Sequence, residues 1–263
     1  MKSNLLPEAL YEEVDLTFED VVRHQNNFTT VTGLILDVRK DHNEIIVSLG
    51  NDLIGILPYT EFSIYPFTYK LGDKVPDQIK YMLNHKIRVK VTDIIDDNII
   101  LSRKKNMELA LIHLKECSFA KFLVTNNTNS KLFGDIGDGI VAAVDSKELC
   151  RCRIRNASEI LHKDDVEWMK ILNYDELNRF NMSYKEMFEH YNPENYKPND
   201  GIWCTVNEPV DETHSGYYVA ITPQINGIMD VKNSDPILPY GRKVFARVKS
   251  ANENGVKLYF IGF

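Results

Sequence analysis

The sequence lacks long hydrophobic runs. No apolar stretch approaches the roughly 18 residues that a membrane-spanning helix needs. The first residues, MKSNLLPEALYEEVD, are acidic and have no apolar core of the kind that a signal peptide carries. Four cysteines among 263 residues are too few for a disulfide framework. These features predict a cytoplasmic protein with reduced thiols and no membrane partner.

Signatures of catalysis and of metal binding are also missing. The chain has no P-loop, no GxSxG elbow, no HExxH and no dinucleotide fingerprint, and the glycines of GDIGDG at 134–139 have the wrong spacing to cradle a phosphate. Cys150 and Cys152 form a single close pair without the second pair that a zinc site usually has, which favours buried thiols. We therefore expect no enzyme, no cofactor and no metal.

Neither sign of charge is in large excess. The chain has 31 Lys and Arg against 38 Asp and Glu, and residues 1–27 contain 2 basic and 6 acidic residues. This balance argues against attraction of nucleic acid to the whole surface, so binding would depend on a local basic face.

Short segments rich in β-branched residues dominate the first half of the chain. Five of them read as strands, at 31–38, 45–49, 53–59, 87–95 and 99–102. The long connection at 62–86 separates the third strand from the fourth, which is typical of a small Greek-key barrel of the OB type. Apolar residues then recur at helical spacing from Asn106 to Cys117, which predicts a helix that leads out of the barrel.

The second half alternates between strand-like and helical patterns. We expect a polar linker at 125–130, strands within 132–161, helices at 163–172 and 183–191, and strands from Ile202 onward. The predicted fold class is mainly β with helical connections, built of tandem small five-stranded OB-type barrels. The predicted domains are an acidic N-terminal arm (1–27), a barrel with its exit helix (28–117), a degenerate barrel with a helical insertion (131–200) and a C-terminal barrel (201–263).

One glycine and four short motifs of the first half resemble a known family. They are Gly33, VSLG at 47–50, GILPYTE at 55–61, KIRVKV at 86–91 and LSRK at 101–104. In this order they resemble the S-one RNA-binding domain, an OB-fold family, of bacterial or phage type. Residues 201–263 resemble it more faintly. The resemblance implies binding of single-stranded RNA in translation or RNA metabolism.

The chain departs from the family at the residues that stack on bases. The resemblance implies two exposed aromatic residues around the second strand, where stacking contributes about 1 to 3 kcal/mol per base. The first module has Asn43 and Ile46 at these places, and the last has Ser215 and Tyr218. Because neighbours on a strand point to opposite faces, we expect Tyr218 to be exposed and Tyr217 to point inward.

Other candidate RNA-binding residues fall into three groups. Five aromatic rings, Phe62, Tyr65, Phe67, Tyr69 and Tyr81, interleave with lysines in the 62–86 connection, where Tyr65, Phe67 and Lys86 are the candidates for RNA binding; alternatively, half of these rings cap the barrel end. A basic edge is predicted from Arg88, Lys90, Arg103 and Lys104, with Arg88 and Arg103 exposed; a solvated strand edge is the alternative. Arg151 and Arg153, with Arg155, alternate along an expected strand and would face RNA or an acidic partner, or pair with Asp164, Asp165 and Glu167.

Two functions remain open at this stage. The first is a non-catalytic single-stranded RNA-binding protein of translation or RNA metabolism. The second is an adaptor whose barrels dock onto a protein assembly such as a ribosome, a polymerase or a phage structure, with little affinity for RNA. Binding that weakens steeply as salt rises would distinguish the first from the second.

Overall fold

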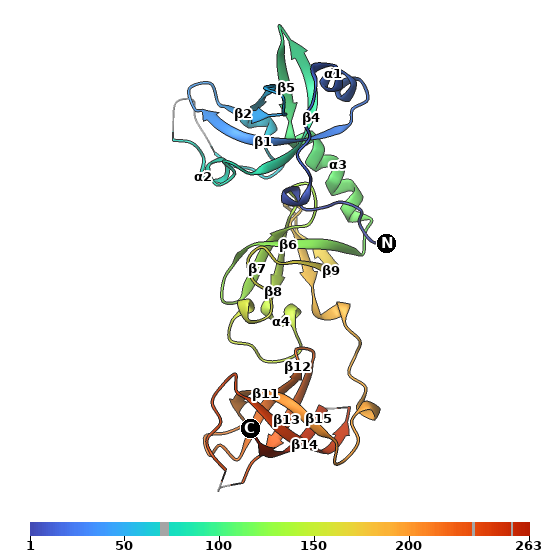
Figure 1. Cartoon of the computed structure of the whole chain (residues 1–263), viewed down its shortest axis with the longest axis vertical. Coiled ribbons are helices and arrows are strands. Elements are labelled where there is room, and N and C mark those ends of the chain that lie inside the picture. Colours follow the sequence, from blue (N-terminus) through green and yellow to red (C-terminus); the bar gives the residue numbers. More distant parts are fainter. Residues whose placement is uncertain (69–73, 233–234, 254) are drawn as a thin grey trace. The chain divides into compact units, whose positions relative to one another are not determined.

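The computed structural model describes residues 1–68, 74–232, 235–253 and 255–263 (Figure 1). It contains three closed five-stranded barrels, so the predicted fold class is confirmed. All three barrels have the same strand order, in which the third strand is hydrogen-bonded to the fifth and the fourth closes the ring against the first. Within the described residues, no helix is long and apolar enough to cross a membrane.

The first barrel follows the predicted strands closely. Its strands are β1 (Thr30–Arg39), β2 (Glu44–Ser48), β3 (Ile54–Pro58), β4 (Lys86–Ile95) and β5 (Asn98–Ser102). Its helices and short 3-10 turns are η1 (Glu8–Leu10), α1 (Phe18–Asn26), η2 (Tyr59–Glu61), α2 (Asp77–Lys80) and the exit helix α3 (Arg103–Lys115). The Ser102 side chain caps α3 by accepting a hydrogen bond from the Lys105 amide, which is why the helix starts three residues before the apolar periodicity does.

Glycines allow the strands of the first barrel to approach one another closely. A Cβ at Gly33 would lie 2.4 Å from Val47 Cγ1, and one at Gly55 would lie 2.4 Å from Leu101 Cδ1. Gly50 has a φ of +85°, a left-handed conformation that favours glycine. Gly33 and Gly55 therefore lie at close approaches of two strands, and Gly50 lies in a turn that a side chain would strain.

The middle barrel differs from its prediction. Its strands are β6 (Phe119–Asn127), β7 (Lys131–Asp135), β8 (Val141–Asp145), β9 (Val166–Tyr174) and β10 (Phe180–Ser183). Its short helical elements are α4 (Ser146–Leu149) and η3 (Ala157–Glu159). The expected linker at 125–130 is partly strand, because β6 continues to Asn127.

The two predicted helices of this region were wrong. Residues 163–172 instead form most of β9, which pairs with β6 through Trp168 and Lys121. Asp164 has a φ of +72°, which a helix does not allow, and strand pairing overrides the helical pattern of the segment. In 183–191, only the three residues of η4 (Lys185–Met187) are helical, in a 3-10 turn.

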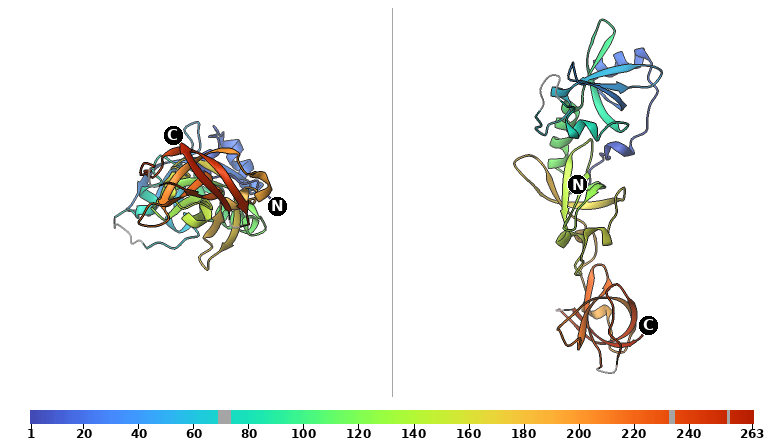
Figure 2. Two further views of the ribbon diagram at one scale, coloured as in Figure 1. Left: turned by 90° about the horizontal axis from the view of Figure 1, so that it is seen from below. Right: turned by 90° about the vertical axis from the view of Figure 1, so that its left-hand side faces the viewer.

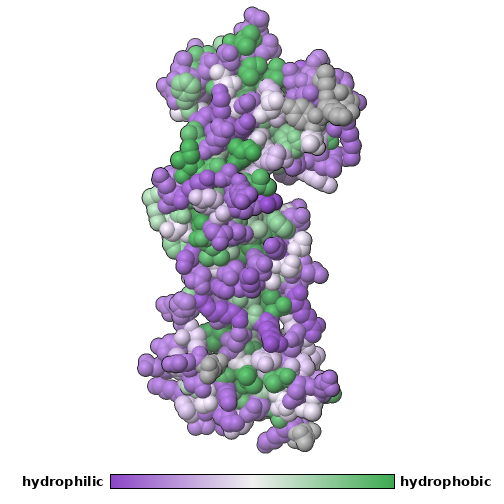
Figure 3. All heavy atoms as spheres, turned by 180° about the vertical axis from the view of Figure 1, so that it is seen from behind, coloured by the Kyte–Doolittle hydropathy of each residue, from purple (hydrophilic) through white to green (hydrophobic). Residues whose placement is uncertain are grey.

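The third barrel contains β11 (Gly201–Pro209), β12 (Gly216–Thr222), β13 (Ile225–Asp230), β14 (Lys243–Asn252) and β15 (Gly255–Gly262), and η5 (Pro193–Asn195) precedes it. In Figure 2 its orange and red strands curve around one another into a closed ring. Its core includes Val206, Tyr217, Val219, Met229 and Leu258. Figure 3 shows hydrophilic residues over much of one face of the chain, with hydrophobic patches between them.

The chain divides into two compact units. One contains residues 1–125, 134–142 and 166–181, and the other contains 126–133, 143–165 and 182–263. The first barrel therefore belongs to the first unit and the third barrel to the second unit.

Candidate functional site

Arg103 lies in the interior of the first unit, contrary to its predicted exposure. Its guanidinium Nη2 lies 2.5 Å from Glu8 Oε2, and its Nε donates to Glu8 Oε1 over 2.8 Å. The two side chains are 7% and 5% exposed. The sequence could not show this pairing, because Glu8 comes from the N-terminal arm, 95 residues away. The predicted exposure of Arg103 on the barrel surface was therefore wrong.

The other cations of the predicted basic edge also have partners in the first unit. The Arg88 guanidinium lies over the Tyr11 ring at 4.0 Å, and its Nε is 3.6 Å from Asp138 Oδ1. Lys90 is buried and donates to the Phe28 carbonyl, and Lys86 donates to the Tyr11 carbonyl over 2.9 Å. The predicted exposure of Arg88 was wrong as well, since its side chain is 18% exposed.

Lys104 is the exception on this edge, since it remains partly exposed at the start of α3. A lone lysine is a weak binding site for a nucleic-acid backbone, which needs several cations along its path.

The turn between β7 and β8 supplies the carboxylates of this buried cluster. Asp135 accepts hydrogen bonds from the amides of Gly137, Gly139 and Glu8 at 2.8, 3.1 and 2.6 Å. Burial, together with the charge of Glu8, raises the pKa of Asp135 to about 7. The glycine-rich turn at 134–139 thus directs its amides at its own aspartate.

The aromatic candidates of the 62–86 connection serve packing. The Tyr65 hydroxyl accepts from the Val141 amide over 2.9 Å and donates to the Asn178 carbonyl over 3.3 Å, and burial raises its pKa to about 12. Phe67 packs edge-on against Phe62, with ring centroids 6.0 Å apart. Tyr69 lies outside the described residues. Phe67 fits the alternative, in which such rings cap the barrel end, because it packs against the core of the first barrel. Tyr65 instead bonds to residues of the middle barrel.

The arginine-rich segment at 150–155 follows α4 as irregular chain, so the expected strand there was wrong. Arg151 pairs with Glu186 at 3.3 Å and Arg153 with Glu208 at 3.3 Å, which replaces the expected pairing with Asp164, Asp165 and Glu167. The Arg155 guanidinium lies over the Tyr240 ring at 3.8 Å. Cys150 is buried, and burial raises the pKa of its thiol. Within the described residues, no three His, Cys, Asp or Glu side chains are grouped to hold a metal ion.

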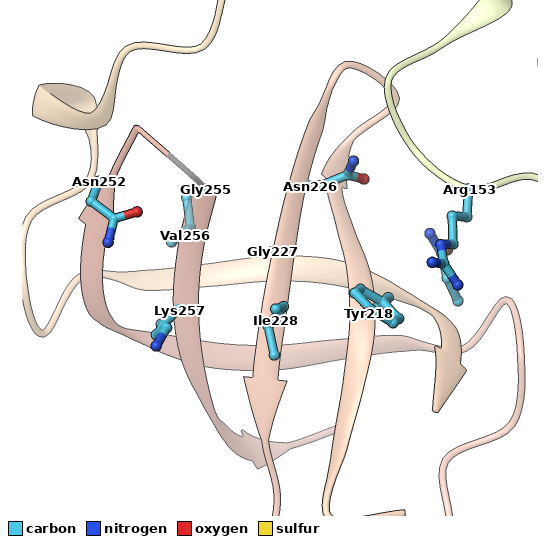
Figure 4. A pocket seen from close by; sticks show the side chains of 10 residues that line it. Arg153, Tyr218, Asn226, Gly227, Ile228, Asn252, Gly255, Val256 and Lys257 are labelled. Atoms are coloured by element: carbon cyan, nitrogen blue, oxygen red, sulfur yellow. The ribbon is translucent and has the colours of Figure 1, made fainter. Parts of the chain in front are cut away.

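This segment is attached to the third barrel at the turn between β12 and β13. Cys152 Sγ donates to the Thr222 carbonyl over 3.1 Å, and the Asn226 side chain donates to the Arg151 carbonyl. These contacts bring Arg153 over the Tyr218 ring, at 4.4 Å from the centroid. Figure 4 shows the Arg153 side chain entering beside Tyr218 from a separate segment.

Tyr218 and Tyr217 point as predicted. Tyr217 is 1% exposed, and its hydroxyl accepts a hydrogen bond from the Leu238 amide over 3.1 Å. Tyr218 lies on the opposite, outward face of β12 and is partly exposed. The prediction of their orientation is confirmed, and a role for Tyr218 in binding remains a prediction.

Tyr218 belongs to a row of side chains that crosses three strands. It pairs with Ile228 of β13, which in turn pairs with Lys257 of β15. The row lines a groove of about 440 Å³, whose lining also includes Arg153, Asn207, Asn226, Gly227, Asn252, Gly255 and Val256. Figure 4 shows Tyr218, Ile228 and Lys257 side by side across the sheet. The groove thus combines an aromatic ring, an aliphatic floor, cations and amide groups.

The same row of the first barrel has a different chemistry. Ile46 pairs with Ile56, which pairs with Ile100. A groove of about 410 Å³ there is lined by Phe18, Arg39, Ile46, Asp52, Leu53, Ile54, Ile56, Asp97, Asn98 and Ile99. The first barrel therefore has isoleucines at the two places where the third has a tyrosine and a lysine, and its groove contains two aspartates and one arginine.

Sequence reasoning missed Lys257, Ile228, Asn207 and Asn226. The strand register could have revealed them. Gly227 of β13 is equivalent to Gly55 of β3, so the neighbours of these two glycines are equivalent as well. The faint motif of the third barrel was too weak to fix that register.

No protein-family model and no curated protein matches the chain. Among solved structures, the chain is similar to a complex of a/eIF2alpha and aDim2p with rRNA from Pyrococcus horikoshii, with 18% identity, a TM-score of 0.26, and coverage of 27% of this chain and 44% of that one. It is also similar to a multidomain protein with nucleic acid binding domains from Streptococcus pneumoniae (14% identity, TM-score 0.24, 89% of this chain and 73% of that one). A third is GSP13 from Bacillus subtilis (20% identity, TM-score 0.27, 31% of this chain and 63% of that one).

The chain thus spans less than half of the first of these structures and less than two thirds of the third. With TM-scores below 0.3, these similarities do not identify a ligand for the groove.

Proposed function

We propose that this protein is a non-catalytic, single-stranded RNA-binding protein of translation or RNA metabolism, and that it binds RNA in the groove of the third barrel. The observation that carries the proposal is the row of Tyr218, Ile228 and Lys257 across β12, β13 and β15. A ring on which a base stacks, beside a cation that meets the phosphate, is the combination that sequence-tolerant single-strand binders use. In OB folds, ligands bind on the strand 2–3 face and its adjoining loops, and this groove lies there.

Arg153 gives the groove a second cation, and it covers the Tyr218 ring while no RNA is bound. Its guanidinium covers one face of Tyr218 and lies 3.3 Å from Glu208. A base that stacks on this face of the ring displaces Arg153, which is then free to meet a phosphate. The Tyr218 ring is then covered by the Arg153 guanidinium in the free protein and by a base in the complex with RNA.

The resemblance to the S-one domain, of bacterial or phage type, supports the same proposal through motifs of the first barrel. We place the protein in the cytoplasm, where such RNA is found. The candidate residues of the first barrel contribute little in this scheme, because Arg88, Lys90 and Arg103 are already paired within their own unit.

A specific observation favours an adaptor function for the first barrel. Its groove is lined mainly by apolar side chains and by Asp52 and Asp97, with Arg39 as the one cation among its lining residues. This mostly apolar and acidic lining suits a protein surface with apolar and basic groups better than a phosphate backbone. A ribosomal or other assembly partner for this face is compatible with RNA binding by the third barrel.

Fluorescence anisotropy of a labelled single-stranded RNA of about 12 nucleotides, a length within the usual site sizes of OB folds, tests the proposal. We expect Tyr218→Ala to weaken binding by about 1 to 3 kcal/mol, because it removes the stacking ring. Tyr218→Phe is the matched control and retains most of the affinity, since it keeps the ring. Lys257→Gln should lower the slope of affinity against salt by about one, because one phosphate contact is lost.

Two results would count against the proposal. Absence of measurable RNA binding by the unaltered chain would leave the adaptor function. Binding that is equally tight in the Tyr218→Ala variant would move the site away from this groove.

A further inference from the structure

The outward side of β11, β14 and β15 forms a second surface of the third barrel, which adjoins the groove at Lys257 and extends beyond it. Neither β14 nor β15 contains an aspartate or a glutamate, and together they carry Lys243, Arg247, Lys249 and Lys257. Their exposed faces therefore carry cations in a chain whose net charge is -7.

Aromatic rings lie between these cations. Trp203 of β11 is 57% exposed and pairs with Phe245 of β14, with ring centroids 5.3 Å apart. Arg247, two residues along the same face of β14, pairs with Tyr259 of β15, which is 45% exposed. Two aromatic platforms thus lie on either side of a guanidinium.

The Phe245 ring leans over the neighbouring strand. A Cβ at Gly201, the strand neighbour of Arg247, would lie 2.5 Å from the Phe245 ring. The ring therefore lies in the space that a side chain at this position would fill. Because the ring also packs against Trp203, it loses little entropy on contact, which suits stacking by a planar ligand.

The charges indicate which planar ligand fits. Lys249 is 2.9 Å from Asp230, but within the described residues neither Lys243 nor Arg247 forms an ion pair. Cations without carboxylate partners attract phosphates, and exposed aromatic rings stack bases. This surface is also continuous with the groove, since Lys257 and Tyr259 lie two residues apart on the same outward side of β15.

We propose that the outward face of β11, β14 and β15 is a second contact surface for single-stranded RNA. A strand that leaves the Tyr218 groove past Lys257 continues over Tyr259, Arg247 and the Trp203–Phe245 pair. The inference rests on the proposed function, because it extends the path of the same RNA. It predicts that the third barrel contacts a longer segment of RNA than its groove holds.

Tryptophan fluorescence tests this surface directly, since the chain has only two tryptophans. Trp168→Phe leaves Trp203 as the only one, and Trp168 lies in the other unit. We expect a 12-nucleotide RNA to quench Trp203 with the same midpoint that anisotropy gives, and an RNA of about four nucleotides, enough to fill the groove alone, to quench it much less.

Affinity measurements with matched variants complete the test. Trp203→Ala should weaken binding of the longer RNA by about 5- to 100-fold, the equivalent of one stacked base, and leave the short RNA unaffected. Trp203→Phe is the control that keeps a ring, and Arg247→Ala should lower the salt slope by about one. Circular dichroism verifies that each variant is folded.

The outcomes separate this inference from the proposed function. If RNA binds, but Trp203 is not quenched and Trp203→Ala and Arg247→Ala bind the longer RNA normally, the second surface is refuted and the groove stands. If no RNA binds the unaltered chain, the proposed function fails first. If Trp203→Ala instead abolishes self-association in sedimentation velocity and leaves RNA affinity unchanged, the face is a protein interface and the inference is overturned.

Discussion

Replacing Arg103 by methionine should destabilise the first unit without acting on RNA directly. The substitution keeps a long side chain and removes the buried guanidinium. It leaves the Glu8 carboxylate, 5% exposed, beside the buried Asp135 with no cation between them. It also removes the hydrogen bond from Arg103 to the Phe62 carbonyl, which is 3.2 Å long.

The magnitude follows from the burial of the pair. Removing one partner of a buried ion pair typically costs about 3 to 5 kcal/mol, because the remaining charge has lost its compensation. Lys104→Met is the matched control, since Lys104 is the next residue of α3 and is partly exposed. Surface substitutions of this kind change stability by about 0.5 kcal/mol or less.

Urea unfolding followed by Trp168 fluorescence, in a Trp203→Phe background, isolates the first unit. This design matters because a chain with two units need not unfold in one step. Arg103→Met combined with Glu8→Gln should cost less than the sum of the two single changes, since each removes the same pair. Normal stability of Arg103→Met together with weakened RNA binding would refute this reasoning and restore Arg103 as a surface cation.

Two further predictions concern the same unit. Gly55→Ala should destabilise it by about 1 to 3 kcal/mol in the same urea assay through overpacking, because the new Cβ would lie 2.4 Å from Leu101 Cδ1; Lys104→Met again serves as the control, and equal stability of both variants would contradict the close approach. The raised pKa of Asp135, about 7 against an ordinary 3.8, means that the folded state holds its proton more tightly than the unfolded state. The stability from this group is therefore complete below about pH 4 and is lost as the pH rises through 7. Asp135→Asn should flatten the decline in the unfolding free energy between about pH 4 and 7, and an unchanged slope would assign that decline to other groups.

The barrels could be predicted from the sequence because their signals are local. Alternating β-branched residues and turn residues marked β1 to β5 and β11 to β15, and the spacing of the strands indicated the long connection before β4. The inward direction of Tyr217 followed from strand alternation alone. Such features depend on neighbours within a few residues, which a single sequence shows.

The buried charges and the middle barrel could not be predicted in this way. The pairing of Arg103 with Glu8 joins residues that are 95 positions apart, and a basic run beside a strand looks the same in sequence whether it is solvated or buried. Residues 166–174 have acidic and apolar residues at helical spacing, but pairing with β6 makes them a strand. The groove residues around Lys257 depend on a register that only the folded barrel fixes.

The outward rows of the first and third barrels show that, in this fold, different residues provide the core and the exposed face of the sheet. Inward residues such as Val47 and Val219 occupy one set of alternate positions, and the rows around Ile56 and Ile228 occupy the other. For protein engineering, the barrel is therefore a scaffold with an interchangeable face, on which a row of three side chains can be rewritten while the core sequence is kept.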